Sequence, residues 1–255
     1  MKVNNFDFAG RACFDLNLYS RSVYKVKSTM PSDPDIMRYY DRIAPTYDES
    51  RFSNSYGRYI HTQETAVLTD WLRGIPAEGI LDLGCGTGRF LAFAGSGLDR
   101  SAEMLAVARS KFPDKNLYTG DAENTGFPPD SFSAVFSFHV FMHLDKAKTQ
   151  AILDEMYRIL RPGGVLVIDF PSHKRRLLSG RRQPGWHGAN EFTPVDWRRM
   201  AGDRWLTEAS RGILFFPVHR LPVFLRPFFR RSDSLLCRSP FKEYASYLVI
   251  RLRKK

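Results

Sequence analysis

The chain has 255 residues, of which 43% are hydrophobic and 25% are charged, values typical of a soluble globular protein. That length buries a sizeable core in one α/β domain, and no charge-free apolar run is long enough to span a bilayer. The three cysteines are odd in number and far apart, which argues against a disulfide framework and a zinc site. With no apolar stretch at the N-terminus, we expect a cytoplasmic protein without a signal peptide.

The net charge of +11 is the unusual bulk property, and it is concentrated late in the chain. Basic runs lie at 173–182, 220–231 and 251–255. Such an excess attracts phosphates, whether those of nucleic acid, of anionic lipid or of a phosphorylated substrate. A basic, well-solvated surface explains the same composition, so charge alone leaves both interpretations open.

The first 72 residues contain no strand pattern. Residues 1–33 lack periodicity and lead into the turn-rich "TMPSDPD", which we interpret as a boundary after an N-terminal extension. Residues 34–72 show helical periodicity, with Pro45 breaking or kinking the first helix.

From residue 80 onward, short apolar runs alternate with helical segments. The runs at 80–83, 96–98, 117–119, 134–138 and 165–170 are typical of strands buried on both faces of a parallel sheet. Helices are expected at 89–93, 102–111 and 146–160, and a further helix starts at the Thr193 cap with Pro194 in its first position. "WLTEASRGILFF" and "YASYLVIRL" predict two more strands around a Pro- and Phe-rich insertion at 217–241. The pattern predicts a doubly wound, mostly parallel α/β sheet.

A glycine-rich loop follows the first strand in "ILDLGCGTGRFL". Gly84, Gly86 and Gly88 let the backbone turn sharply and approach a ligand, and a helix from Arg89 would aim free N–H groups at it. Arg89 stands where a dinucleotide motif has its third glycine, and no Lys follows Gly88 as in a P-loop. The loop therefore matches neither a dinucleotide motif nor a P-loop, and on its own a tight strand–helix turn of an α/β protein explains it equally well.

Two acids follow the next two strands. Asp99 ends the second strand, where a carboxylate accepts both hydroxyls of a ribose through bonds of about 1.5–3 kcal/mol each. Asp121 ends the third strand, where it accepts the exocyclic amine of adenine while Ala122 leaves room for the ring. Loop, ribose acid and adenine acid occur in strand order, which favours an adenosyl ligand.

These motifs, with "FSAVFSFHVFMHL" and "YRILRPGGVLVIDF", resemble the class I S-adenosylmethionine-dependent methyltransferases, in the small-molecule branch that includes the ubiquinone and menaquinone biosynthesis C-methyltransferases. The resemblance covers 39–171 strongly. It implies a seven-stranded Rossmann-like methyltransferase fold, S-adenosylmethionine as cofactor, and a lid in "YYDRIAPTYDE" whose aromatic side chains close over it. The implied cofactor-binding residues are Tyr40, Tyr47, Asp82, Gly84, Cys85, Gly86, Asp99, Arg100, Asp121, Ala122, Glu123, Ser137, Phe138 and His139.

The resemblance also divides the chain. We expect one methyltransferase domain over 34–255: a helical lid at 34–72, a cofactor-binding core at 79–171, and an acceptor flap with the insertion 217–241 and the last strands over 172–255. Two departures stand out. Only "RFLAFAGSG" separates the glycine loop from Asp99, so the first crossover helix is expected to be a stub, and Ser133 stands where the family usually has an acid.

Methyl transfer from a sulfonium needs mainly alignment of the nucleophile, which supplies up to about 7–11 kcal/mol. A general base is needed only when the nucleophile loses a proton. His139 and His143 are the candidates and would share a face if this stretch is helical, although a structural or cofactor-side role is open for His143. No metal site is expected. We favour catalysis by proximity, with no essential base.

The acceptor side is predicted from a smaller set of residues. Asp169, at the end of the fifth strand, faces the expected acceptor pocket, although a structural acid fits there too. A flap at 185–192 would offer an apolar wall and two polar anchors through Trp186, Phe192, His187 and Glu191, with an ordinary loop as the alternative.

The sequence therefore predicts methyl transfer to a small molecule, either a natural product or a lipid-linked metabolite. The insertion mixes Phe and Leu with Arg, as in a cap over a lipid-like acceptor or a segment on an anionic membrane; a packed helical insert is the plainer interpretation. One rival is an RNA or DNA methyltransferase using the basic tail, although "SFHV" replaces the base-amine motif "[ND]PP[YFW]". The other is a catalytically silent cofactor-binding scaffold, which would not need the loop and both acids.

Overall fold

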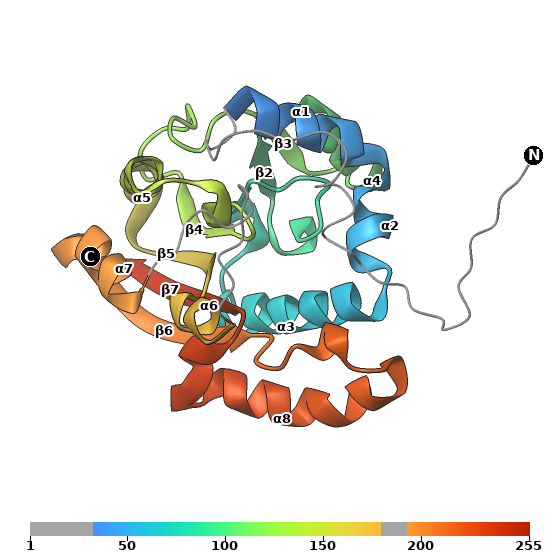
Figure 1. Ribbon diagram of the computed structural model, residues 1–255. Helices are drawn as coiled ribbons and strands as arrows, with labels where there is room; N and C mark the ends of the chain where they lie inside the picture. The colour runs from blue at the N-terminus through green and yellow to red at the C-terminus, as the bar shows by residue number, and fades with distance from the viewer. Residues whose placement is uncertain (1–32, 180–192) are drawn as a thin grey trace, which may run out of the picture.

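A computed structural model describes residues 33–179 and 193–255 (Figure 1). Its centre is a seven-stranded sheet in the order β3-β2-β1-β4-β5-β7-β6, with helices on both faces. The strands are β1 (Ile80–Leu83), β2 (Ser96–Asp99), β3 (Asn116–Thr119), β4 (Phe132–Ser137), β5 (Leu160–Pro171), β6 (Trp205–Ile213) and β7 (Tyr247–Lys254). The predicted doubly wound, mostly parallel architecture is confirmed.

The strand directions place several strand ends at one edge of the sheet. The five strands β1 to β5 pair in parallel, whereas β7 is antiparallel to both β5 and β6. The carboxyl ends of β1, β2, β4 and β5 therefore meet at the same edge, where ligands of open α/β sheets bind. This edge carries the glycine loop.

The helices fall into three groups along the chain. Before the sheet come α1 (Asp33–Ile43), α2 (Tyr47–Phe52) and α3 (Ser55–Trp71); between strands lie α4 (Ala102–Lys111) and α5 (Lys146–Ile159); after β5 come α6 (His173–Ser179), α7 (Pro194–Ala201) and α8 (Arg226–Arg238). Short 3₁₀ turns are η1 (Ala44–Thr46), η2 (Ala77–Gly79), η3 (Leu91–Phe93), η4 (Phe141–His143), η5 (Gly202–Arg204), η6 (Val218–Arg220), η7 (Val223–Leu225) and η8 (Pro240–Tyr244). Pro45 separates α1 from α2, and a Thr193 capping box starts α7, as predicted.

Each face of the sheet is covered by a separate apolar core. On one face, Leu81, Ile168 and neighbouring strand residues pack with Ile152 and Met156 of α5. On the other face, Ile80, Phe136 and Val167 pack with apolar residues of α3. Because the central strands are buried on both sides, they read in the sequence as continuous apolar runs.

The expected helix at 89–93 is wrong. Only the 3₁₀ turn Leu91–Phe93 forms there, because few residues separate β1 from β2 and the loop turns through Gly88 at φ +83°. The predicted stub crossover is thereby confirmed, but the helix N-terminus expected to face the ligand is absent from this described segment. Backbone N–H groups of the glycine loop are left as the donors on that side.

Candidate active site

The glycine loop combines left-handed backbone angles with open space. Gly84, Gly86 and Gly88 have φ of +73°, +53° and +83°, a region that side chains disfavour. A Cβ on Gly84 would lie 2.3 Å from Val140 Cγ2, whereas a Cβ on Gly86 would meet nothing within 4 Å. The loop is therefore packed at its first glycine and open at its second.

Asp99 stands beside that opening at the end of β2. Its Oδ2 accepts the Gly86 N–H at 2.8 Å and its Oδ1 accepts the Ser101 N–H at 2.9 Å. Burial raises the pKa of the Asp99 carboxyl, against the lowering effect of these backbone donors. Each carboxylate oxygen keeps a lone pair for a further donor, as two ribose hydroxyls require.

Asp82 lies at the end of β1 and is 3% exposed. Burial raises the pKa of its carboxyl well above the usual value. Among the residues that the structure describes, none donates a hydrogen bond to its Oδ2. A buried acceptor without a donor is costly, so this oxygen suits a ligand that brings an N–H group.

The remaining predicted cofactor residues divide into two groups. The Asp121 carboxylate forms an ion pair with Arg100, and both are exposed with Glu123, while Ala122 is partly buried against the core. In contrast, Cys85 and Phe138 are buried, and the Ser137 hydroxyl donates to the Leu83 carbonyl at 2.8 Å. The side chains of Cys85 and Phe138 pack in the core, and that of Ser137 joins β4 to β1.

The helices α1 and α2 lie against the glycine loop. The Ser101 hydroxyl donates to Asp41 at 2.5 Å and the Thr87 hydroxyl donates to Asp48 at 2.6 Å. Tyr40 and Tyr47 are edge to face with ring centroids 6.2 Å apart, and burial raises the pKa of both. The predicted lid helices therefore contact the loop and the end of β2.

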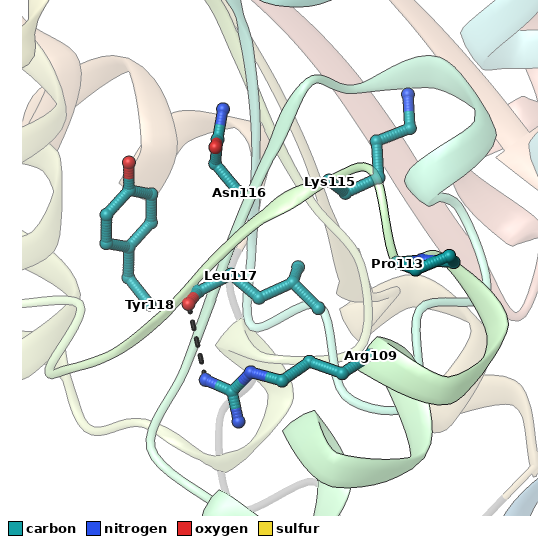
Figure 2. A pocket seen from close by; sticks show the side chains of 6 residues that line it. All are labelled: Arg109, Pro113, Lys115, Asn116, Leu117 and Tyr118. Atoms are coloured by element: carbon teal, nitrogen blue, oxygen red, sulfur yellow. Dashed lines mark hydrogen bonds between the residues drawn. The ribbon is translucent and has the colours of Figure 1, made fainter.

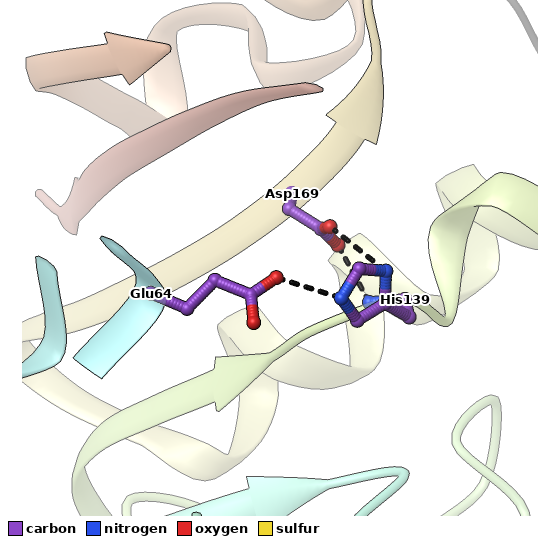
Figure 3. A group of neighbouring side chains, drawn as sticks. All are labelled: Glu64, His139 and Asp169. Carbon is purple, nitrogen blue, oxygen red and sulfur yellow. Dashed lines mark hydrogen bonds and ion pairs between the residues drawn. The ribbon is translucent and has the colours of Figure 1, made fainter. Parts of the chain in front are cut away.

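His139 is the centre of a buried polar cluster (Figure 3). Its Nε2 lies 2.7 Å from Glu64 Oε1, its backbone N–H donates to Asp169 Oδ1 at 2.7 Å, and its Nδ1 lies 3.6 Å from Asp169 Oδ2. Glu64 Oε2 also accepts Arg89 Nη1 at 2.5 Å. Three elements distant in sequence thus converge on one imidazole.

The charges of this cluster shift its protonation equilibria. Burial lowers the pKa of His139, but the carboxylates of Glu64 and Asp169 outweigh it and the pKa is raised. Burial raises the pKa of Glu64, but Arg89 and His139 outweigh it and the pKa is lowered. Burial raises the pKa of Asp169 to about 6. Glu64 is therefore ionised at neutral pH, and the two carboxylates favour the protonated form of His139.

His139 and His143 do not share a helical face. His139 has φ +62° and precedes the 3₁₀ turn at 141–143, so no α-helix relates the two rings. His143 Nε2 lies 3.0 Å from the Tyr40 hydroxyl, on the lid side, whereas His139 faces α3 and β5. The two histidines thus occupy different environments.

Sequence reasoning missed Glu64 and the partnership with Arg89. Glu64 is 1% exposed and stands in α3 among buried Ile60, Val67 and Leu68. An acid inside the apolar stripe of a helix is the signal that would have found it. The predicted flap residues Trp186, His187, Glu191 and Phe192 lie outside the described residues.

Two cavities lie away from the glycine loop. Figure 2 shows one of about 480 Å³ at the edge strand β3, where Arg109 donates to the Leu117 carbonyl at 3.3 Å. A second, of about 180 Å³ and mostly apolar, lies beyond β5 and is lined in part by Phe170, Leu177 and Leu248. Neither contains Asp99 or His139 in its lining.

Comparison with known proteins identifies the family. A family described as a methyltransferase domain matches residues 81–168. A 2-phytyl-1,4-naphtoquinone methyltransferase of Thermosynechococcus vestitus is 33% identical over 165 residues, 58% of this chain and 70% of that protein. The enzyme of the same name from Synechocystis is 29% identical over 189 residues, 67% of this chain and 76% of that protein.

A solved structure agrees with the fold. The magnesium protoporphyrin IX methyltransferase of Synechocystis with bound S-adenosylhomocysteine (SAH) superposes with a TM-score of 0.63 at 16% identity, covering 88% of this chain and all of that one. The chain belongs to the class I S-adenosylmethionine-dependent methyltransferases, in the branch that acts on small molecules, and S-adenosylmethionine is its cofactor.

The residues present fit this cofactor. No atom lies within 4 Å of a Cβ built on Gly86, Asp99 keeps lone pairs for ribose hydroxyls, and Asp82 Oδ2 lacks the donor that an amine would supply. When bound, the cofactor supplies an activated methyl group on a sulfonium. The protein's part is to bind the cofactor and the acceptor and to orient them.

Proposed function

We propose that this enzyme methylates an apolar, lipid-linked acceptor that it takes from an anionic membrane surface. The observation that carries the proposal is the reversed polarity of α8. This helix lies beside α3 at the bottom of Figure 1. Its buried residues are Asp233 and Cys237, whereas Phe228 and Leu235 are exposed to solvent.

The inner face of α8 is held by hydrogen bonds. Asp233 is fully buried and accepts the Tyr59 hydroxyl at 2.9 Å, Gln63 Nε2 at 2.8 Å and the Phe216 N–H at 2.6 Å. Cys237, one turn further on, is also buried. Three donors on one buried carboxylate fix which face of α8 points inward.

The outer face of α8 and the preceding turn carry apolar side chains. Phe224, Phe228 and Leu235 are 73%, 77% and 71% exposed. The spacing of Phe228 and Leu235 by seven residues places them on one stripe. The exposed Arg230, Arg231 and Arg238 lie on the same helix. Aromatic side chains beside arginines are typical of a helix at the surface of an anionic bilayer.

The interaction energies of these side chains are large enough for α8 to bind a membrane surface. Full burial of a Phe or Leu side chain contributes about 1.5–3 kcal/mol, and an Arg near an anionic surface contributes about 1 kcal/mol. Arg230 lies over the Tyr59 ring and is left out of this sum. Three such apolar residues with Arg231 and Arg238 match or exceed what a single acyl chain gives, so reversible membrane binding is expected. Among residues 33–179 and 193–255, no helix is long and apolar enough to cross a bilayer.

The names of the relatives support a lipid-linked acceptor. Two of them are methyltransferases of a phytyl-bearing naphthoquinone, an aromatic ring on an isoprenoid chain. Transferred to this chain, that chemistry suggests a reduced quinone or a similar hydroxylated ring. The apolar cavity beyond β5 and the exposed Leu177 and Leu178 on α6 are consistent with an apolar approach to the site.

Within this proposal the cofactor is bound by the residues named from the sequence. Asp99 binds the ribose, the glycine loop faces the sulfonium end with Asp82, and the lid tyrosines close over it. Asp121 and Ala122 bind the adenine, with Asp121 leaving Arg100 to do so. Ser137 and Phe138 contribute backbone only, Asp169 and His139 face the acceptor, and 185–192 is its flap.

The test combines binding and turnover. Flotation with vesicles of phosphatidylcholine and phosphatidylglycerol should retain the protein, and phosphatidylcholine alone or raised salt should release it. Replacing Phe224 and Phe228 by Ser should release it from anionic vesicles. The matched control makes the same change to Ser at Val195 and Leu206, which are exposed on α7 and β6. This control variant should bind anionic vesicles as the parent does. Retention by the Phe variant would refute the membrane surface.

Turnover is measured on reduced 2-phytyl-1,4-naphthoquinone incorporated in the same vesicles. Methylated product is expected, at a rate that falls with the Phe224→Ser, Phe228→Ser variant. If the enzyme methylates water-soluble phenols, without vesicles or detergent, at least as fast as the quinol in vesicles, a lipid-linked acceptor is refuted.

The basic tail gives little support to a nucleic-acid substrate. Arg251 and Arg253 pair with Glu208, and Lys254 pairs with Asp130. These cations lie within the β6–β7 part of the sheet and neutralise acids of the same chain. A salt-sensitive gel shift of the protein with RNA would favour an RNA methyltransferase despite these ion pairs.

A further inference from the structure

Glu64 is the buried acid for which the predicted cofactor contacts have no use. It comes from α3, outside the glycine loop, and meets His139 and Asp169 from the ends of β4 and β5 (Figure 3). Arg89 is bound to Glu64, and the ring of Tyr247 is edge-on to His139 at 5.3 Å. Tyr56 and His61, both on α3, also interact electrostatically with Glu64. Two carboxylates and one imidazole thus lie together at the edge of the sheet where the cofactor is expected to bind, and they need a chemical explanation.

The two ring nitrogens of His139 have unequal partners. Nε2 to Glu64 Oε1 at 2.7 Å is a strong hydrogen bond, whereas Nδ1 to Asp169 Oδ2 at 3.6 Å is beyond hydrogen-bond range. The ionised Glu64 therefore assigns the proton to Nε2 and leaves the lone pair on Nδ1. The side chain of His139 is 21% exposed while Glu64 is 1% exposed, so the imidazole is the member that a ligand can reach.

The arrangement suits a proton better than a metal ion. One imidazole lies between two carboxylates, with each nitrogen directed to a different acid. A single divalent ion would need the ring to turn away from one of them and Glu64 to leave Arg89. A proton needs neither movement.

We propose that Glu64 is a positioning residue, which orients His139 so that Nδ1 accepts the proton that the acceptor's hydroxyl loses during methyl transfer. In this step the nucleophilic atom of the acceptor bonds to the methyl carbon. The carbon–sulfur bond breaks with its electron pair left on sulfur, and the hydroxyl proton moves to Nδ1. The inference rests on the proposed function for the acceptor, but the Glu64–His139 hydrogen bond is testable without one.

The charges favour this step. With neutral His139, the two carboxylates and Arg89 leave one net negative charge, which complements the positive sulfonium. After transfer the imidazolium lies between two carboxylates, which outweigh its burial and raise its pKa. Glu64 thus stabilises the protonated product of the step and fixes the ring before it, as an orienting carboxylate does in catalytic triads.

The first experiment is an NMR titration of the histidine rings of isotope-labelled enzyme with SAH bound, using His139→Gln to assign the signal. In Glu64→Gln, which preserves shape, the pKa of His139 should fall by about 1–3 pH units. Asp70→Asn, an acid-to-amide change at an exposed position of the same helix, should leave it unchanged. An unchanged pKa in Glu64→Gln would overturn the proposal.

The second experiment measures rates on reduced 2-phytyl-1,4-naphthoquinone. Glu64→Gln should lower kcat by about 10²–10⁴-fold with KM nearly constant. The acid limb of the pH–kcat profile should move to lower pH in this variant. Equal kcat, or an unmoved limb, would overturn the proposal. Because Arg89 would lose its partner, Glu64→Gln combined with Arg89→Met is the backup where the single variant does not fold. If the parent enzyme ignores this quinol, the acceptor assignment fails while the titration still decides the role of Glu64.

Discussion

Replacing Asp99 by Ala tests the cofactor site most directly. The side chain holds the N–H groups of Gly86 and Ser101 and is placed to accept two ribose hydroxyls. Hydrogen bonds to a charged acceptor contribute about 1.5–3 kcal/mol each. Two lost bonds therefore give about 3–6 kcal/mol, and at least ~100-fold weaker binding even if water recovers part of it.

Isothermal titration calorimetry with SAH measures this change. Asp121→Ala is the control, because its carboxylate is exposed and already paired with Arg100, so a smaller loss is expected. Far-ultraviolet circular dichroism checks that Asp99→Ala keeps the fold. Affinity within about threefold of the parent, in a folded Asp99→Ala protein, would show that the ribose contact is misassigned.

Four further substitutions probe the glycine loop, the anchor of α8 and Asp169. Gly84→Ala should lower stability by more than about 2 kcal/mol because its Cβ meets Val140 at a positive φ, and Gly86→Ala by less because only φ opposes it; equal melting temperatures would contradict this. Asp233→Ala removes the acceptor shared by three donors, of which the Phe216 N–H has no other acceptor among the described residues, and should cost about 2–4 kcal/mol in denaturant unfolding. A neutral effect would mean that α8 is not anchored there. The pKa of Asp169 is raised to about 6 from 3.8, so its stabilising contribution is present below the lower value and lost as pH rises through the higher one. As the pH rises from about 4 to 6, the melting temperature of Asp169→Asn should therefore increase relative to that of the parent. A melting-temperature difference that does not change with pH would contradict the raised pKa of Asp169.

The fold was predictable because burial leaves a periodic record. The strands β1, β4 and β5 appear as apolar runs because they are buried, and the Thr193 cap and Pro45 break are local chemistry. The run at 117–119 forms the edge strand β3, which is mostly exposed and not buried on both faces as expected. The helix at 89–93 failed because chain length between strands, which propensity does not measure, leaves room for a 3₁₀ turn only.

The site was predictable where motifs follow strand order and unpredictable where distant segments meet. Asp99 stands beside the glycine loop because both end parallel strands. Glu64 is 75 residues from His139, and a left-handed backbone at a histidine has no sequence signal. The outward face of α8 was equally hidden, since only Asp233 and its partners decide which side of the helix packs.

The α3 helix joins these features. Gln63 binds α8 through Asp233, and the next residue, Glu64, binds His139. If α8 rests on a bilayer, the helix α3 fixes the height of the His139 imidazole above the lipid headgroups. An acceptor ring would then have to rise by a fixed amount while its tail remains embedded, so tail length itself becomes a selection rule for what is methylated.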